Sequence, residues 1–304
     1  MENNIYDLAI LGAGPAGICA AIYATRAKLN TIWLDRKFVQ GGEIVDTYEV
    51  DNYPGLPGIT GLDLGEAMAG HAEKLGLKPK REPVLSVTDE GEIKVIRTKK
   101  NEYHARAVII ACGATHRHLG IPGEEELGGM GVSYCATCDA AFFQDGTVAV
   151  VGGGNVAVED AILLSRTCKK VYLVHRRDEL RAEKILQDSL FACHNVELVW
   201  DSVPVGEDKV TALKVRNVKT DEEKEISVDG VFIAVGIVPG SGKFKDLVKM
   251  DESGYIIAGE DGVTSTPGIF AAGDIRTKNL RQVVTAVADG ANAVASVQRY
   301  LMEY

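Results

Sequence analysis

Residues 6–17 read YDLAILGAGPAG, an apolar run that ends in a glycine-rich turn. The branched and apolar residues of YDLAILG predict a buried parallel strand, and AGICAAIYATRAKL (16–29) predicts the helix that follows. NTIWLD (30–35) predicts a second strand. A glycine motif between a strand and a helix in such a unit is typical of a dinucleotide-binding fold.

The same order recurs later in the chain. TVAVVGGG (147–154) predicts a strand and a glycine turn, NVAVEDAILLSRTC (155–168) a helix, and KKVYLVHR (169–176) a strand. Two such units predict an α/β fold with two Rossmann-like dinucleotide-binding domains.

Charge and cysteine content narrow the function classes. The 304 residues contain 33 Lys and Arg against 43 Asp and Glu, a net charge of −10, which argues against binding of nucleic acid or anionic membrane. No apolar run approaches the ~18 residues of a membrane-spanning helix. Of six cysteines, only Cys135 and Cys138 are close in sequence, and a secreted disulfide scaffold would be shorter and richer in Cys. We therefore expect a cytoplasmic protein, where thiols stay reduced unless a disulfide has a function.

The first glycine motif predicts a site for an adenosine dinucleotide. Gly12 permits a tight turn, Gly14 lets a pyrophosphate approach the backbone, and Gly17 lets the helix pack on the strand. The helix N-terminus offers free N–H groups to the phosphates. Asp35, at the end of the next strand, suits the two ribose hydroxyls. The alternative is a strand–turn–helix unit packed without a ligand.

The second motif differs at one decisive position. GGGNVA supplies Gly152, Gly154 and Ala157, but His175 stands where the first unit has an acid. Three arginines follow: Arg176, Arg177 and Arg181. Guanidinium groups attract a 2′-phosphate that a carboxylate would repel, so we expect NADPH here rather than NADH. The alternative is a solvated basic face.

A third stretch identifies the first dinucleotide. FAAGDI (270–275) predicts a strand that ends in Gly273 and Asp274, where the carboxylate suits a flavin ribityl chain. The last helix then starts near Arg281, Gln282 and Val283, and its N-terminus would favour negative charge on a flavin. The sequence therefore predicts FAD in the first site.

Residues 134–143, YCATCDAAFF, leave three alternatives for the thiol pair Cys135 and Cys138. A zinc site needs four ligands, and the only nearby histidines, His116 and His118, lie in a predicted connection, so we expect no metal. A structural disulfide across two residues would stabilise little. Redox exchange remains, and it gives Asp139 a role as general acid and base.

Taken together, GAGPAG, GGE (41–43), DNYPGLP (51–57), CATCD, GGGNVA, HRRDELRA, FAAGD and RQVVTA resemble the low-molecular-weight thioredoxin reductase family over essentially the whole chain. The resemblance implies a discontinuous FAD domain, 1–112 with 245–304, and an inserted NADPH domain, 113–244. It implies hinges near Gly113-Ala114 and Val238-Gly240, on which the inserted domain rotates, and a homodimer. The chain departs from the common pattern at Cys112, Ala140 and Gly240.

The resemblance also implies roles for further residues. Cys138 would be the thiol nearer the flavin, and Cys135 the one that attacks the partner, thioredoxin, with Phe142 and Phe143 as a docking surface or as core. The expected FAD contacts are Gly12, Gly14, Ala16, Gly17, Asp35, Arg36, Gly41, Gly42, Glu43, Asn52, Gly113, Gly273, Asp274, Arg281, Gln282 and Val283. The expected NADPH contacts are Gly152, Gly154, Asn155, Ala157, Glu159, His175, Arg176, Arg177, Arg181 and Ile237.

Two other functions remain compatible with these residues. One is a disulfide reductase that serves another thioredoxin-like or peroxiredoxin-linked partner. The other is a flavin-binding redox sensor without turnover.

Overall fold

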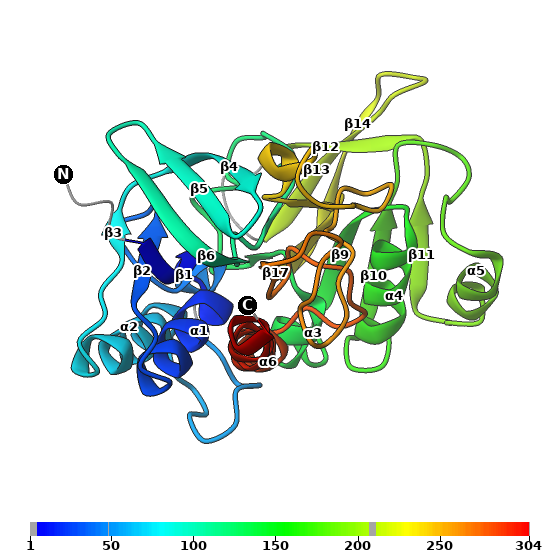
Figure 1. The fold of residues 1–304 in the computed structure, drawn as a ribbon. Helices are drawn as coiled ribbons and strands as arrows, with labels where there is room; N and C mark the ends of the chain where they lie inside the picture. The colour runs from blue at the N-terminus through cyan, green and yellow to red at the C-terminus, as the bar shows by residue number, and fades with distance from the viewer. Residues whose placement is uncertain (1–4, 48, 207–210, 304) are drawn as a thin grey trace. The chain divides into compact units, whose positions relative to one another are not determined.

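The computed structural model describes residues 5–47, 49–206 and 211–303. The chain forms two compact units, Met1–Thr115 with Val238–Tyr304, and His116–Ile237 (Figure 1). The first unit is therefore built from both ends of the chain, and the second is inserted into it. The second division follows Ile237, whereas the family resemblance implies one after Phe244. Phe244 is fully buried in the core of the first unit, which explains the difference.

The first unit is organised around a sheet. Among the described residues it has seven strands, in the order β3-β2-β1-β6-β5-β4 with β17 also paired to β6. Neighbours in β3-β2-β1-β6 and the pair β6-β17 are parallel, and β4-β5-β6 is antiparallel. The strands are β1 (Ile5–Leu11), β2 (Thr31–Asp35), β3 (Lys80–Arg81), β4 (Val84–Glu90), β5 (Ile93–Thr98), β6 (Glu102–Ile110) and β17 (Ile269–Ala271).

Helices from opposite ends of the chain pack together in this unit. They are α1 (Pro15–Arg26), α2 (Gly61–Lys74) and α6 (Val283–Glu303), with the 3₁₀ turns η1 (Gly42–Asp46) and η3 (Gly242–Phe244). Apolar side chains of α1, α2 and α6 share one core with the sheet, which includes Leu8, Trp33 and Val297. At the α1–α6 contact, a Cβ on Gly290 would overlap the carbonyl oxygen of Ala16. The absence of a side chain at Gly290 thus sets how closely the two helices approach.

The second unit contains a parallel sheet of five described strands in the order β11-β10-β9-β15-β8. Its elements are β8 (Val132–Ser133), α3 (Ala136–Asp139), η2 (Ala140–Phe143), β9 (Thr147–Gly152), α4 (Asn155–Leu164), β10 (Lys170–Val174), α5 (Lys184–Phe191), β11 (Val196–Val199) and β15 (Gly230–Ala234). An antiparallel sheet adds β12 (Ser202–Gly206), β13 (Ala212–Asn217) and β14 (Glu223–Ser227). β7 (Ala114–His116) pairs with β16 (Ile237–Pro239).

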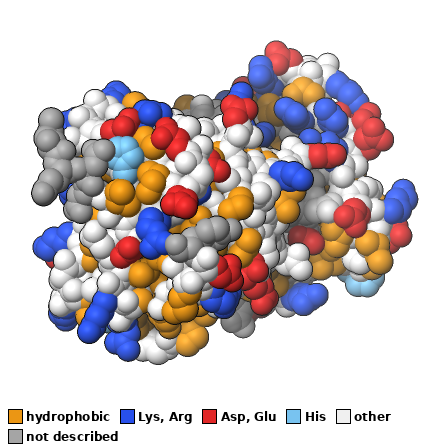
Figure 2. Space-filling model, in the orientation of Figure 1, with side chains coloured by type: hydrophobic (Ala, Val, Ile, Leu, Met, Phe, Trp, Pro, Cys, Tyr) orange, Lys and Arg blue, Asp and Glu red, His pale blue; other side chains and the backbone are white. Residues whose placement is uncertain are grey.

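These observations confirm the predicted fold class. Both predicted strand–helix–strand units are present, as β1–α1–β2 and β9–α4–β10. None of the helices in the described ranges is long and apolar enough to cross a membrane. On the face drawn in Figure 2, Lys and Arg side chains are interspersed with Asp and Glu.

The close contact between α1 and α6 predicts how a substitution at Gly290 changes the free energy of unfolding. A control substitution at Gly70 should change it in the opposite direction. Gly290→Ala should lower the free energy of unfolding by about 1–3 kcal/mol, because the new methyl overpacks the interface. Gly70→Ala, on α2 where a Cβ meets no atom within 4 Å, should raise it by roughly 0.5–1 kcal/mol through helix propensity. Urea unfolding followed by circular dichroism measures both. Equal effects of the two substitutions would contradict the packing argument.

Candidate active site

The first glycine turn lies between β1 and α1 and has the close contacts that its sequence predicts. A Cβ on Gly12 would overlap the carbonyl oxygen of Ala111, and one on Gly17 would overlap the carbonyl oxygen of Gly12. The indole of Trp33 donates a 2.9 Å hydrogen bond to the Gly12 carbonyl. Gly14 is the N-cap of α1 and provides no side-chain cap. The first N–H groups of α1 are therefore available to an anion.

Asp35 ends β2 next to this turn, since the Gly12 N–H bonds the neighbouring Leu34 carbonyl at 2.8 Å. Burial raises the pKa of the Asp35 carboxyl, while the backbone N–H groups of Arg36 and Lys37 lower it. The side chain of Arg36 is exposed. A partly buried carboxylate at this position is a suitable acceptor for ribose hydroxyls.

Segments far apart in sequence meet at the same site. The Gly41 N–H bonds the Ala13 carbonyl at 2.8 Å, and a Cβ on Gly42 would come within 3.1 Å of the Gly14 Cα. The amide of Asn52 donates a 2.9 Å hydrogen bond to the Gln282 side chain. The structure thus joins four of the predicted contact segments in two pairs, although Glu43 is exposed and lies 3.4 Å from Lys37.

Two buried polar atoms of the first unit fit a bound flavin nucleotide. Within the described residues, Asp274 Oδ1 and Arg281 Nε have no hydrogen-bond partner. Burial raises the pKa of Asp274, and the charges of Lys278 and Arg281 lower it. The Arg281 guanidinium lies 4.1 Å from the centroid of the Tyr255 ring. Buried polar groups are normally paired, so both atoms indicate that a polar ligand completes this site.

The turn Gly273–Asp274 is held by a carboxylate that sequence reasoning did not identify. Asp289, on α6, accepts hydrogen bonds from the Gly273 N–H at 2.9 Å, from two Arg276 nitrogens at 2.8 and 2.6 Å, and from Lys278 at 2.9 Å. All three charged side chains are at most 7% exposed. Only the excess of charges in DIRTK (274–278) hinted at this cluster in the sequence.

The second glycine turn lies between β9 and α4. Gly154 caps α4 without a side-chain hydrogen bond, and a Cβ on Gly152 would overlap the Ala234 carbonyl. The His175 ring is buried directly against Gly153, and its Nε2 has no partner among the described residues. Burial and the charge of Arg181 lower the pKa of His175, so the ring is neutral near pH 7. His175 therefore packs against the glycine turn at Gly153.

The basic loop after β10 is fixed to this turn. The Arg181 N–H bonds the Gly153 carbonyl at 2.8 Å, and the Asn155 side chain bonds the Glu183 N–H at 2.9 Å and its carboxylate at 3.1 Å. The three arginines are exposed: Arg176, Arg177 and Arg181. Exposed guanidinium groups and an uncapped helix N-terminus both attract anions, so this arrangement is chemically suited to a phosphate group.

The structure shows the burial or backbone position of four other predicted contact residues. Ala157 is fully buried in α4, and Glu159 on the same helix is exposed. Gly113 has a φ of +66° and accepts the Gly240 N–H at 2.9 Å. Ile237 begins β16.

Cys135 and Cys138 form a disulfide at the start of α3, with a Cα–Cα distance of 5.3 Å. Cys135 is the N-cap, and its Sγ lies 3.2 Å from the Cys138 N–H. Sulfurs bonded to each other do not bind zinc, and the described residues contain no group of three or more His, Cys, Asp or Glu placed to hold a metal. The geometry is that of an oxidised exchange pair.

The residues around the pair have distinct environments. Asp139 is partly buried, which raises its pKa, whereas a hydrogen bond from Ser133 lowers it. Phe143 packs edge-to-face on Phe232 with ring centroids 5.3 Å apart, so it is core, while Phe142 is 47% exposed. Sequence reasoning missed Ser133, since a serine two residues before a cysteine carries no local signal.

Comparisons with known proteins agree with these sites. The sequence pattern of the family described as pyridine nucleotide-disulphide oxidoreductase matches residues 6–290. The chain is 47% identical to a thioredoxin reductase from Listeria innocua and 46% identical to one from Bacillus subtilis, over 99% of this chain and 96% of each relative.

Solved structures give the same result. The crystal structure of thioredoxin reductase from Streptococcus pyogenes has a TM-score of 0.95 at 44% identity and covers 100% of both chains. That of Lactococcus lactis, described as the FR conformation, has a TM-score of 0.67 at the same identity, over 98% of this chain and 100% of that one.

The buried cluster of Asp289 gives a second stability prediction. Asp289→Ala should lower the free energy of unfolding by about 3–5 kcal/mol, because Arg276 and Lys278 would remain buried without their counter-ion. Glu73→Ala, which removes an exposed ion pair with Lys78 in the same unit, should cost about 0–1 kcal/mol. Urea unfolding measures the difference. Similar costs for the two variants would show that the cluster is not needed for stability.

Proposed function

This oxidoreductase belongs to the pyridine nucleotide-disulphide oxidoreductase family, and we propose that it is an NADPH- and FAD-dependent thioredoxin-disulfide reductase. The overall reaction is NADPH + H⁺ + thioredoxin disulfide → NADP⁺ + thioredoxin dithiol. The observation that carries the proposal is the Cys135–Cys138 disulfide at a helix start, with Asp139 beside it. The relatives named thioredoxin reductase support thioredoxin as the partner.

The second unit is proposed to bind NADPH. Its uncapped α4 N-terminus suits the pyrophosphate, and Arg176 and Arg177 suit the 2′-phosphate. Arg181 and Asn155 hold the basic loop at the glycine turn. His175 is neutral and buried, so the end of β10 presents no negative charge that would repel the 2′-phosphate.

The first unit is proposed to bind FAD. When bound, FAD accepts two electrons from a reduced nicotinamide and delivers them to a disulfide. Asp35 would hold the adenosine ribose, and the uncapped N-terminus of α1 the pyrophosphate. The buried Asp274 Oδ1 and Arg281 Nε would gain the partners that they lack among the described residues.

The thiols would transfer the electrons to thioredoxin in two exchanges. The Cys135 thiolate attacks one sulfur of the thioredoxin disulfide, which forms a mixed disulfide and releases the other sulfur as a thiolate. The Cys138 thiolate then attacks the Cys135 sulfur, which releases the second thioredoxin thiolate and restores the Cys135–Cys138 bond. Asp139 would take a proton from an attacking thiol and return it to a leaving thiolate.

Location and assembly complete the proposal. We propose a cytoplasmic homodimer without nucleic-acid or membrane partners. Cys19, Cys112, Cys168 and Cys193 are free thiols, as suits a reducing compartment, and the net charge of −10 disfavours polyanions.

Single-cysteine variants test the function. With NADPH, Cys135→Ser and Cys138→Ser should each abolish reduction of thioredoxin. Cys138→Ser should still trap a single-cysteine thioredoxin that carries a thionitrobenzoate group, releasing one thionitrobenzoate per mixed disulfide, and Cys135→Ser should not. Absorbance and non-reducing gels measure the trap. Reduction of thioredoxin by both variants would refute the redox role of the cysteine pair. If the wild-type protein reduced another thioredoxin-like protein but not thioredoxin, the proposal that thioredoxin is the partner would be refuted.

Arginine substitutions test the nucleotide. Arg176→Ala with Arg177→Ala should raise the KM for NADPH about 10- to 100-fold, since charge-assisted hydrogen bonds to the 2′-phosphate are lost. The KM for NADH, which lacks that phosphate, should change less than about twofold. Arg166→Ala, an exposed arginine elsewhere in this unit, is the control. Equal increases with both nucleotides would show that the two arginines maintain the loop and do not recognise the phosphate.

A further inference from the structure

Ser133 is in contact with both parts of the redox site. It ends β8, is 6% exposed, and pairs in register with Phe232 of β15. Its hydroxyl lies 2.5 Å from Asp139 Oδ2 and accepts the Cys135 N–H at 3.0 Å. The Cys135 carbonyl lies 3.4 Å from the same hydroxyl. One buried oxygen therefore joins the acid to the backbone of the first cysteine.

The hydroxyl can satisfy either protonation state of Asp139. It has one hydrogen and two lone pairs, and the Cys135 N–H occupies one lone pair. When Asp139 is ionised, the hydrogen goes to its carboxylate, because that bond is short and charge-assisted. When Asp139 is protonated, the carboxyl becomes a donor to the second lone pair, and the serine hydrogen can turn to the Cys135 carbonyl.

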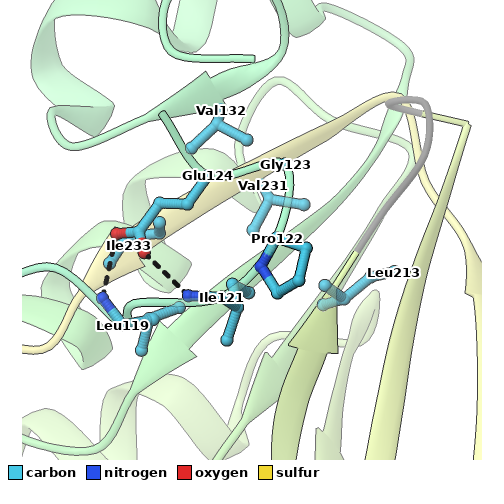
Figure 3. Close-up of a pocket in the computed structure, with 9 residues that line it drawn as sticks. All are labelled: Leu119, Ile121, Pro122, Gly123, Glu124, Val132, Leu213, Val231 and Ile233. Carbon is cyan, nitrogen blue, oxygen red and sulfur yellow. Dashed lines mark hydrogen bonds between the residues drawn. The ribbon is translucent and has the colours of Figure 1, made fainter. Parts of the chain in front are cut away.

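The backbone around this hydroxyl is fixed by a second cluster. Glu124 accepts the Leu119 N–H at 2.9 Å (Figure 3). It also accepts the Gly120 N–H at 2.7 Å and the hydroxyl of Tyr134 at 2.7 Å. His118 Nδ1 lies 3.0 Å from the same hydroxyl, and the His116 ring lies against the Tyr134 ring with centroids 5.2 Å apart. Tyr134 connects Ser133 to Cys135, so the serine hydroxyl moves within a rigid frame.

We propose that Ser133 is a positioning residue of the redox centre, whose hydroxyl holds the Asp139 carboxylate beside the thiol pair and turns to the Cys135 carbonyl whenever Asp139 binds a proton. The inference rests on the proposed function, which makes Asp139 the acid and base of the thiol exchange. It adds a residue that neither accepts nor releases a proton during turnover.

The charges around Asp139 make this hydroxyl important. Burial raises the pKa of Asp139, and Ser133 lowers it. The neighbouring α4 carries two further acids, Glu159 and Asp160, and burial together with Glu159 raises the pKa of Asp160 to about 7. η2 and β15 contain no titratable side chain, and the Tyr134 hydroxyl is held by Glu124. Ser133 is thus the donor that favours ionised Asp139.

Loss of the Ser133 hydroxyl changes the pKa of Asp139 in one direction only. Without the hydroxyl, the pKa of Asp139 rises further, so the carboxyl is protonated over a wider range of pH. It then acts as a base only at higher pH. The acid limb of the thiol exchange should shift to higher pH, by about one to two units for the loss of one hydrogen bond to a charged group.

The test compares Ser133→Ala with Ser133→Thr, which retains the hydroxyl, and with Ser189→Ala, which removes an exposed hydroxyl in the same unit. Each protein is reduced with dithiothreitol, freed of reductant, and reacted with a neutral disulfide between pH 5 and 9 without NADPH. Infrared difference spectra of the carboxyl band follow Asp139 directly. We expect Ser133→Ala to shift both the rate profile and the carboxyl titration, and the other two variants to match the wild type.

Three results would overturn the proposal, and they are distinguishable. If Asp139→Asn shifts the acid limb but Ser133→Ala leaves it in place, the serine does not position the acid and the proposed function stands. If Asp139→Asn leaves the limb unchanged, the role of Asp139 in the proposed function fails, and the role of Ser133 fails with it. A shift with Ser133→Thr as large as with Ser133→Ala would likewise count against the hydroxyl.

Discussion

The carboxylate of Asp289 is the contact on which the first unit depends. It fixes the Gly273–Asp274 turn through the Gly273 N–H, and it balances Arg276 and Lys278 in a buried environment where unpaired charge is costly. The next residue, Gly290, brings α6 against α1 at Ala16. One turn of the last helix therefore contacts both the Gly273–Asp274 turn and α1, which come from opposite ends of the chain.

The two units share the glycine turn before an uncapped helix, but they differ in the side chains next to that turn. Each ends a parallel strand in a glycine turn, and each leaves the next helix without a side-chain cap. The difference lies at the end of the neighbouring strand, where Asp35 presents a carboxylate and His175 turns a neutral ring onto Gly153. In the second unit exposed arginines follow this position, and they are the groups proposed to recognise the nucleotide. A single position thus separates the two proposed nucleotide preferences.

Much of the fold could be predicted from the sequence because the patterns that indicate it are local. Branched apolar runs, glycine spacing and the residue at Asp35 or His175 all lie within one strand–helix–strand unit. Ser133 and Asp289 could not be found in this way, because their partners lie on other elements or depend on the path of the backbone. The same holds for Phe142 and Phe143: only the packing on Phe232 shows which of the two is core.

Two features of the redox site act on the proton that passes between the thiol and the Asp139 carboxyl. At the start of α3 the Cys138 N–H points at the Cys135 sulfur, which favours a thiolate once the disulfide is open. Burial raises the pKa of Asp139 and favours its protonated form. Both influences make transfer of a proton from the thiol to the carboxyl easier, which is what a reversible exchange near neutral pH requires. The hydrogen bond from Ser133 limits the effect of burial on the pKa of Asp139, so Asp139 remains able to give the proton away as well as to accept it.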